Sequence, residues 1–163
     1  MAPINNRPFL EYQMDYWMNQ GITRFILSVG YLSDSIINHF GYKYQDAIIE
    51  YSIESNPLGT GGALVQAIKN LSEPVLVING DTFFEVDLQL LYSFHCINES
   101  IFTLALYKVN ACNRYLGIDI ANTGKILEFS SANRESMSAQ LVNGGAYIVD
   151  PLTINTFNFK VKK

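Results

Sequence analysis

Three glycine-containing stretches of the sequence carry residue types that bind phosphates, metals or sugars. The first is residues 57–64, Pro-Leu-Gly-Thr-Gly-Gly-Ala-Leu, which we predict to connect a strand to a helix. Glycines here would let backbone N–H groups approach a phosphate, and the helix would offer its positive end. A flexible turn is the alternative interpretation. The stretch is neither a dinucleotide-binding GxGxxG motif, because Leu64 takes the third glycine position, nor a P-loop, because no Gly-Lys-Ser/Thr follows.

The second stretch is Asn79-Gly80-Asp81, directly after an apolar run at 74–78. In open α/β sheets, ligands bind at the carboxyl ends of the strands. A carboxylate there can hold Mg²⁺ while the metal also binds phosphates. A plain turn would use the same residue types. The position of Asp81, one strand after the glycine-rich stretch, favours the metal-binding interpretation.

The third stretch is residues 141–147, Leu-Val-Asn-Gly-Gly-Ala-Tyr. The side-chain amide of Asn143 can both donate hydrogen bonds to sugar hydroxyls and accept them. A simple β-turn explains Asn-Gly-Gly equally well. By itself, this stretch does not decide between a sugar-binding segment and a turn.

Alternating helix and strand patterns must position these stretches. Asp87 is predicted to cap a helix, and the continuous apolar run at 74–78 is typical of a strand in a parallel sheet covered on both faces. Helices are predicted at 8–20, 34–40, 62–70 and 88–97, and strands at 24–29, 47–53, 74–78, 102–107, 116–120, 126–129 and 146–149. This order predicts an α/β fold with a mostly parallel, mixed sheet, and the length predicts a single domain over residues 1–163.

The composition excludes several classes of protein. Hydrophobic residues make up 48% of the chain and charged residues 16%, which is typical of a globular domain. The net charge of -4 argues against nucleic-acid binding, which needs clustered Lys and Arg. Cys96 and Cys112 form neither a disulfide framework nor a zinc motif. No apolar run approaches the ~20 residues that cross a bilayer. We expect a soluble cytoplasmic protein without a signal peptide or a membrane partner.

Several other polar residues are predicted to have no role in chemistry. Glu11 and Asp15, one helical turn apart, are interpreted as a solvated helix face. His39 is interpreted as a capping or surface residue near a helix end. His95 and Cys96 lie on a predicted helix with no second metal ligand nearby.

Taken in order, these stretches resemble segments of the sugar-1-phosphate nucleotidyltransferase family over essentially the whole chain. Residues 1–11 are similar to the segment after the family's signature loop, and residues 54–64 to its nucleotide-contacting loop. Residues 79–81, followed by 87–88, resemble its metal-binding strand end, and residues 142–147 its sugar-binding strand. Four motifs in one order are more specific than any single motif. The resemblance implies a Rossmann-like nucleotidyltransferase fold.

Within the family, three phrases are most similar to the branch that acts on heptose 1-phosphates: Met-Ala-Pro-Ile-Asn, Asn-Gly-Asp-Thr-Phe-Phe and Asn-Arg-Tyr. The resemblance implies that GMP is transferred from GTP to a heptose or mannose 1-phosphate in the presence of Mg²⁺. The products would be pyrophosphate and a GDP-sugar for surface polysaccharide, either lipopolysaccharide or capsule. The implied partners are the nucleoside triphosphate and the sugar 1-phosphate, and a homo-oligomer stays open.

By motif match, the resemblance also assigns residues to roles, while the catalytic residues stay unassigned. Asp81 would bind the metal. Gly117, Asn143 and Gly144 would hold the sugar. The nucleotide would contact Glu54, Leu58, Gly59, Thr60, Gly61, Gly62 and Gly80.

The sequence departs from the family pattern at several places. The family's signature loop, with its Arg and Lys, and the first strand should precede Met1, and a C-terminal segment with a second metal-binding Asp is missing, so we expect a domain truncated at both ends. Ser131 and Ala132 stand where the family has Glu-Lys, and Leu116 where it has Gly. We therefore expect a sheet without its first strand, poor stability and no guanylyltransferase activity from the chain as written. The alternatives are an incompletely recorded enzyme, a non-catalytic relic or nucleotide-sugar binding module, and an unrelated dinucleotide-binding protein.

Overall fold

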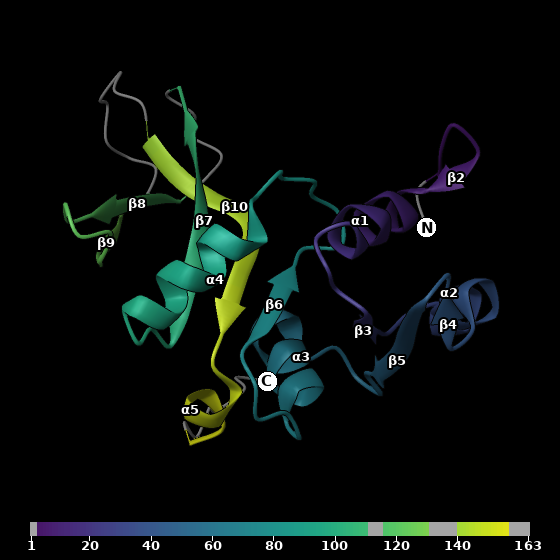
Figure 1. Ribbon diagram of the computed structural model, residues 1–163. Helices are drawn as coiled ribbons and strands as arrows, with labels where there is room; N and C mark the ends of the chain where they lie inside the picture. The colour runs from purple at the N-terminus through teal and green to yellow at the C-terminus, as the bar shows by residue number, and fades with distance from the viewer. Residues whose placement is uncertain (1–2, 111–115, 131–139, 157–163) are drawn as a thin grey trace. The chain divides into compact units, whose positions relative to one another are not determined.

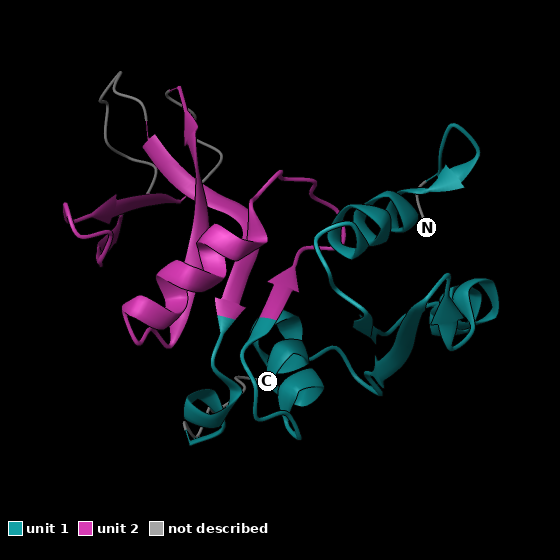
Figure 2. Cartoon of the chain, in the orientation of Figure 1, with its two compact units in different colours: residues 1–75, 149–163 teal, residues 76–148 magenta. Residues whose placement is uncertain are grey.

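The chain divides into two compact units, which Figure 2 colours teal and magenta. Unit 1 consists of Met1–Val75 and Val149–Lys163, and unit 2 of Leu76–Ile148. The computed structural model describes residues 3–110, 116–130 and 140–156. None of the helices in these ranges is long and apolar enough to span a membrane.

The described part of unit 1 contains a three-stranded sheet, a two-stranded ribbon and four helices (Figure 1). Its strands are β1 (Pro3–Ile4), β2 (Arg7–Pro8), β3 (Arg24–Val29), β4 (Lys43–Tyr44) and β5 (Ala47–Ile53). Its helices are α1 (Phe9–Met18), α2 (Ser33–Phe40), α3 (Gly59–Ile68) and α5 (Pro151–Thr156). The sheet has the order β3-β5-β4. Because β3 and β5 are parallel, with Val29 opposite Ile53, their carboxyl ends lie at one edge, whereas β4 runs antiparallel to β5.

Unit 2 contains a second three-stranded sheet, a separate ribbon and one helix among the described residues. The elements are β6 (Val75–Ile78), α4 (Leu88–Ile97), β7 (Phe102–Val109), β8 (Gly117–Ile120), β9 (Ile126–Ser130) and β10 (Gln140–Val149). The sheet has the order β6-β10-β7, and Figure 1 shows β10 running opposite to both neighbours. The ribbon pairs β8 with β9 antiparallel. The long central strand is buried over most of its length, with Ile148 at 1% and Val149 at 0% exposure.

Apolar side chains at helical and strand spacing form the core of unit 1. Met14 and Trp17, three residues apart on α1, are 0% and 3% exposed, and Ile49 on β5 is 1% exposed. Residues three apart share one face of a helix, so this face of α1 is the buried one. Gly41 ends α2 with a φ of 60°, a conformation that favours glycine.

The predicted bounds of β3, β5 and α4 agree with the structure. Asp87 caps α4 as predicted, because its Oδ1 accepts a hydrogen bond from the backbone N–H of Leu90 at 3.0 Å. The structure differs from the sequence prediction at α3, which begins at Gly59 rather than at 62. The glycine-rich stretch is therefore the first turn of a helix, so the flexible-turn interpretation is wrong.

The strand around the Asn-Gly-Gly stretch is also longer than predicted. β10 starts at Gln140 rather than at 146, so Asn143 and Gly144 lie within a strand and not in a β-turn. The side chains of β6 are half-buried rather than covered on both faces, and its neighbour β10 is antiparallel. In the described residues, β3 and β6 are each at the edge of their sheet, so one side of each has no strand partner there.

Candidate functional site

Glu54 lies at the edge of the unit 1 sheet where β3 and β5 end. A Cβ atom placed on Gly30, which follows β3, would lie 3.8 Å from the Cβ of Glu54. The backbone N–H of Glu54 donates to the carbonyl oxygen of Val29 at 2.8 Å. Its Oε2 accepts a hydrogen bond from the backbone N–H of Leu58, the N-cap residue of α3, at 2.9 Å. Glu54 therefore fixes the connection from β5 to α3.

The glycines at the start of α3 leave open space beside the backbone. Gly59 has a φ of 70°. A Cβ atom on Gly59 or Gly61 would meet no described atom within 4 Å, and Thr60 between them is exposed. The first N–H groups of a helix have no acceptor within the helix. The described packing does not require a glycine at Gly61, whereas a phosphate or base lying against this backbone would.

In unit 2, the stretch that follows β6 is tied to β10. The backbone N–H of Asn79 donates to the carbonyl oxygen of Gly145 at 2.8 Å. Gly80 and Asp81, which follow, are exposed, and nothing lies within 4 Å of a Cβ atom placed on Gly80. The hydroxyl of Thr82 donates to Oδ1 of Asp81 at 3.2 Å. Within the described ranges, Asp81 takes part in no ion pair.

The two glycines that follow Asn143 face the same stretch. Oδ1 of the exposed Asn143 accepts a hydrogen bond from the backbone N–H of Gly145 at 2.9 Å. The side-chain NH₂ group of Asn143 is therefore the part best suited to donate to a ligand. Gly145 has a φ of 86°, and a Cβ atom there would lie 3.2 Å from Nδ2 of Asn79. Such a φ favours glycine.

Asp81 fits a cation that takes most of its ligands from phosphates and water. Within the described ranges, no group of three or more His, Cys, Asp and Glu residues could hold a metal ion. Mg²⁺ is commonly bound by one or two carboxylates together with substrate phosphates, so a single exposed carboxylate meets this requirement. The donor set does not fit a metal enclosed entirely by the protein.

The other predicted positions are distributed differently. Gly117 is buried on β8, opposite Ser130 of β9, and thus belongs to a different sheet from Asn143 and Gly144. Ser131 and Ala132 lie outside the described residues. Among the described residues, Asn143 and the stretch that carries Asp81 thus both contact Gly145, the latter through Asn79 and Thr82, whereas the strand pairing of Gly117 is to β9.

Comparison with known proteins decides the family. A family model described as Nucleotidyl transferase matches residues 1–162. The chain belongs to the nucleotidyl transferase family. Its α/β fold and mixed sheets agree with the fold predicted from the resemblance.

The similar proteins include two named as D-glycero-alpha-D-manno-heptose 1-phosphate guanylyltransferase. The one from Aneurinibacillus thermoaerophilus is 42% identical over 92% of this chain, which spans 64% of that relative. The one from Campylobacter jejuni is 37% identical over 99% of the chain and 71% of the relative. Crystal structures of HddC from Yersinia pseudotuberculosis, alone and complexed with GMP-PN, superpose with TM-scores of 0.84 and 0.83. They are 29% identical over 98% of this chain and 70% of HddC.

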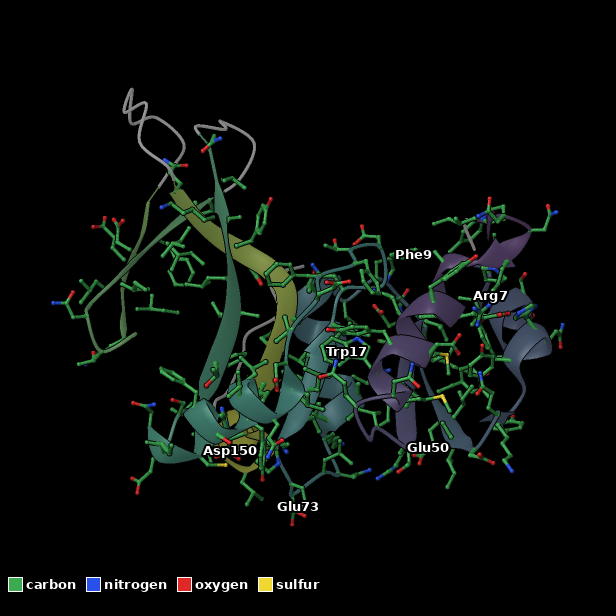
Figure 3. The ribbon with its side chains drawn as sticks, turned by 45° about the horizontal axis from the view of Figure 1, so that its top comes forward. Arg7, Phe9, Trp17, Glu50, Glu73 and Asp150 are labelled. Atoms are coloured by element: carbon green, nitrogen blue, oxygen red, sulfur yellow. The ribbon has the colours of Figure 1, made fainter. Side chains whose placement is uncertain are left out.

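This nucleotidyl transferase chain also contains a polar cluster that its sequence did not predict, centred on Arg7, which is labelled in Figure 3. The Arg7 cluster consists of Arg7, Glu11, Asp15, His39 and Tyr44. Nε of Arg7 donates to Glu11 at 2.6 Å, and Nη2 donates to Asp15 at 2.5 Å and to the hydroxyl of Tyr44 at 2.6 Å. Nε2 of His39 lies 2.7 Å from the other oxygen of Glu11.

The prediction of a solvated face is therefore wrong for Glu11, whereas His39 is an exposed residue in the last turn of α2, as predicted, and also contacts Glu11. The side chain of Glu11 is only 15% exposed, and the hydrogen bond from Arg7, followed by that from His39, lowers the pKa of its carboxyl. Burial raises the pKa of the Tyr44 hydroxyl. His39 and Tyr44 come from α2 and β4, so only the tertiary fold brings them to α1. The Arg7 cluster joins four elements of unit 1 and lies on none of the three predicted binding stretches.

Proposed function

We propose that the protein containing this chain transfers GMP from GTP to a heptose 1-phosphate. A phosphate oxygen of the sugar phosphate forms a bond to the α-phosphorus, the bond from that phosphorus to the bridging oxygen breaks, and pyrophosphate leaves with the electron pair. The observation that carries the proposal is the exposed Asp81 carboxylate on a stretch tied to β10 beside Asn143. The two relatives at 42% and 37% identity, both named as heptose 1-phosphate guanylyltransferases, support the sugar and the base.

The proposed roles are those that the resemblance implies, and the geometry of each unit supports some of them. Asp81 would hold Mg²⁺, which supplies neutralisation of phosphate charge when bound. The NH₂ group of Asn143 would donate to a sugar hydroxyl, with backbone contacts from Gly144 and Gly117. The nucleotide would lie against Glu54, Leu58, Gly59, Thr60, Gly61, Gly62 and Gly80. The open space at Gly61 and Gly80 and the free N-terminal N–H groups of α3 support these contacts.

Three wider statements belong to the same proposal. We take the chain to be part of one nucleotidyl transferase domain, because a single family model spans residues 1–162. The product would enter surface polysaccharide synthesis, as the resemblance implies. A cytoplasmic site of action is supported by Cys96, whose exposed free thiol suits a reducing compartment.

The test measures pyrophosphate release from GTP, D-glycero-α-D-manno-heptose 1-phosphate and Mg²⁺. Because the chain spans 64% of the Aneurinibacillus relative, the assay compares the 163-residue chain with an extended chain. The extended chain is preceded by the corresponding residues of the Aneurinibacillus relative. We expect release from the extended chain that is faster with GTP than with UTP, and faster with the heptose than with mannose 1-phosphate.

Three results would contradict this function. Equal rates with UTP would overturn the assignment of the base, and faster release with mannose 1-phosphate would overturn the assignment of the sugar. Tight binding of GDP-heptose by both chains, with no pyrophosphate from either, would support a nucleotide-sugar binding module instead.

A further inference from the structure

The ring of Phe84 occupies the space that a side chain at Gly144 would need. A Cβ atom placed on Gly144 would lie 2.3 Å from Cδ1, 2.5 Å from Cε1 and 3.0 Å from Cγ of Phe84. These atoms include the base of the ring, so a small adjustment of a flexible tip cannot relieve the clash. Because protein interiors are close-packed, the ring would have to leave its place. Phe84 itself therefore explains why residue 144 is a glycine.

The same ring contacts the next strand of the sheet. Phe84 and Tyr107 of β7 meet edge to face, with ring centroids 5.6 Å apart and an angle of 78° between the planes. Edge-to-face packing is a favoured arrangement of aromatic pairs. Because β7 is the neighbour of β10, Phe84 packs on two adjacent strands at once. The position of this ring is thus determined by the sheet and not by the exposed segment that carries it.

A second contact holds the beginning of that segment. The N–H of Asn79 donates to the carbonyl oxygen of Gly145, and a Cβ atom on Gly145 would lie 3.3 Å from the Cβ of Thr82. The two ends of the 79–84 segment thus contact two consecutive glycines of β10. Asn79 bonds to Gly145, and Phe84 packs on Gly144. Asp81 stands exposed between these two attachments.

We propose that Phe84 is a positioning residue, which holds the Asp81 carboxylate in place for a divalent cation by packing on Gly144. The proposal rests on the metal role of Asp81 described above. Phe84 contacts neither the cation nor the substrates, and it acts through the backbone between residues 81 and 84. It follows that the lack of a side chain at Gly144 serves the Phe84 ring, whereas a sugar contact would use only the backbone there.

A stability cycle on the 163-residue chain tests the contact itself. Gly144→Ala should lower Tm by roughly 3–9 °C, because overpacking displaces the ring. In the Phe84→Ala background, the same substitution should lower Tm much less, because the ring is gone. An equal loss in both backgrounds would show that something other than Phe84 excludes a side chain at 144, and would overturn the proposal.

A metal titration tests the positioning role without any enzyme assay. Mn²⁺ added to the ¹⁵N-labelled chain should broaden the amide signals of Gly80 and Asp81. Phe84→Ala should weaken this binding by about 10-fold or more, as removal of residues that orient metal ligands commonly does. Phe84→Leu, which keeps an apolar side chain, should retain most of the affinity. Phe83→Ala is the matched control, because Phe83 is the neighbouring residue and is 43% exposed.

The outcomes separate this proposal from the function on which it rests. If Mn²⁺ broadens Asp81 equally in the wild type and in folded Phe84→Ala, Phe84 does not position the carboxylate and the inference is wrong. If the wild type itself shows no broadening at Asp81, the proposed metal role is wrong, and the positioning role is overturned with it. Retained affinity in Phe84→Leu, with loss in Phe84→Ala, is the result we expect.

Discussion

The Asp81 side chain is exposed, although residues on both sides of it contact β10. Asn79 is bonded to Gly145, Phe84 packs on Gly144, and the one hydrogen bond described for the Asp81 side chain comes from its neighbour Thr82. An exposed carboxylate held only by a hydroxyl keeps lone pairs available for a cation. This arrangement distinguishes Asp81 from Glu54, whose oxygen accepts from a backbone N–H.

Asp81→Asn in the extended chain should lower kcat by roughly 10²-fold or more. The amide keeps the size of the side chain and can still accept from Thr82, but it loses the charge that attracts the cation. Tm should stay within about 1 °C, because an exposed site contributes little to stability. Glu85→Gln, an exposed carboxylate four residues further along the chain, is the control and should keep full activity. Equal losses in both variants would indicate a general charge effect.

Glu11 gives a pH prediction. Because Arg7 and His39 hold the pKa of this carboxyl below its ordinary value of 4.5, Glu11 contributes its full stabilisation above about that pH. The stabilisation is lost as the pH falls through the lowered pKa of the folded state. Glu11→Gln should therefore reduce the free energy of unfolding by about 1 kcal/mol at pH 7. The difference from wild type should shrink when urea unfolding is repeated at pH 3.

Glu50 provides the comparison for this measurement. Arg24 lowers the pKa of the Glu50 carboxyl, but both partners are about half exposed, at 51% and 45%. Solvent screening weakens such a pair. Glu50→Gln should thus change stability at pH 7 less than Glu11→Gln does. The reverse order would show that the Arg7 cluster is not a stabilising part of unit 1.

Within the element α3, two glycines of the first turn differ in backbone conformation, so we expect alanine substitutions there to have opposite effects on stability. Gly59 has a φ of 70°, whereas the backbone of Gly61 suits any L-residue, and both would have room for a Cβ atom. Gly59→Ala should therefore lower the free energy of unfolding by about 1 kcal/mol through backbone strain. Gly61→Ala should raise it by roughly 0.5–1 kcal/mol, because alanine favours the helix. Urea unfolding of the two variants measures both signs.

Although a side chain at position 61 fits the helix, it should lower the affinity for the nucleotide. If a nucleotide lies against this backbone, Gly61→Val should weaken GTP binding, measured by calorimetry, while the folded fraction stays intact. Normal affinity in the folded variant would remove Gly61 from the site. Urea unfolding thus tests whether the helix requires a glycine at position 61, and GTP binding tests whether the nucleotide does.

Elements with strong local signals were predictable from the sequence, and those stabilised by distant contacts were not. β3 and β5 are short, mainly apolar runs, and Asp87 marks the start of α4, so the bounds of these elements could be predicted. α3 begins at Gly59 although glycine disfavours helices, because tertiary structure overrides propensity. For the Asn-Gly-Gly of β10 the sequence left a sugar-binding segment and a turn open, and the structure shows a strand whose glycines contact Asn79 and Phe84.

The candidate site was predictable to a similar extent. Asp81 and Asn143 were proposed from residue type and position; the structure shows that Asn143 and Asn79, two residues before Asp81, both bond to Gly145, and the roles of Asp81 and Asn143 stay predictions. The sequence did not predict the packing role of Phe84, because its partner Gly144 lies 60 residues further along the chain. Residues that act through packing are found only when the fold shows what they pack against.

For the whole molecule, the division into units predicts separate responses to the two substrates. Most proposed nucleotide contacts, from Glu54 to Gly62, lie in unit 1, whereas Asn143 and Gly144 lie in unit 2. In hydrogen–deuterium exchange, GTP should slow exchange of amides at residues 58–62. The heptose phosphate should slow exchange of those at 143–145. Protection of the same residues by both ligands would contradict the assignment, and GDP-heptose should protect both sets.

The order in which the chain is synthesised gives unit 1 a disadvantage that unit 2 does not have. Unit 2 is one continuous run, Leu76–Ile148, while unit 1 needs a second run that begins at Val149. That run supplies α5, where Nδ2 of Asn155 donates to the carbonyl oxygen of Lys69 at the end of α3 at 3.2 Å. Chains fold domain by domain as they leave the ribosome. When all residues of unit 2 have been synthesised, α3 still lacks its partner α5. Unit 1 therefore begins synthesis first but completes its fold last.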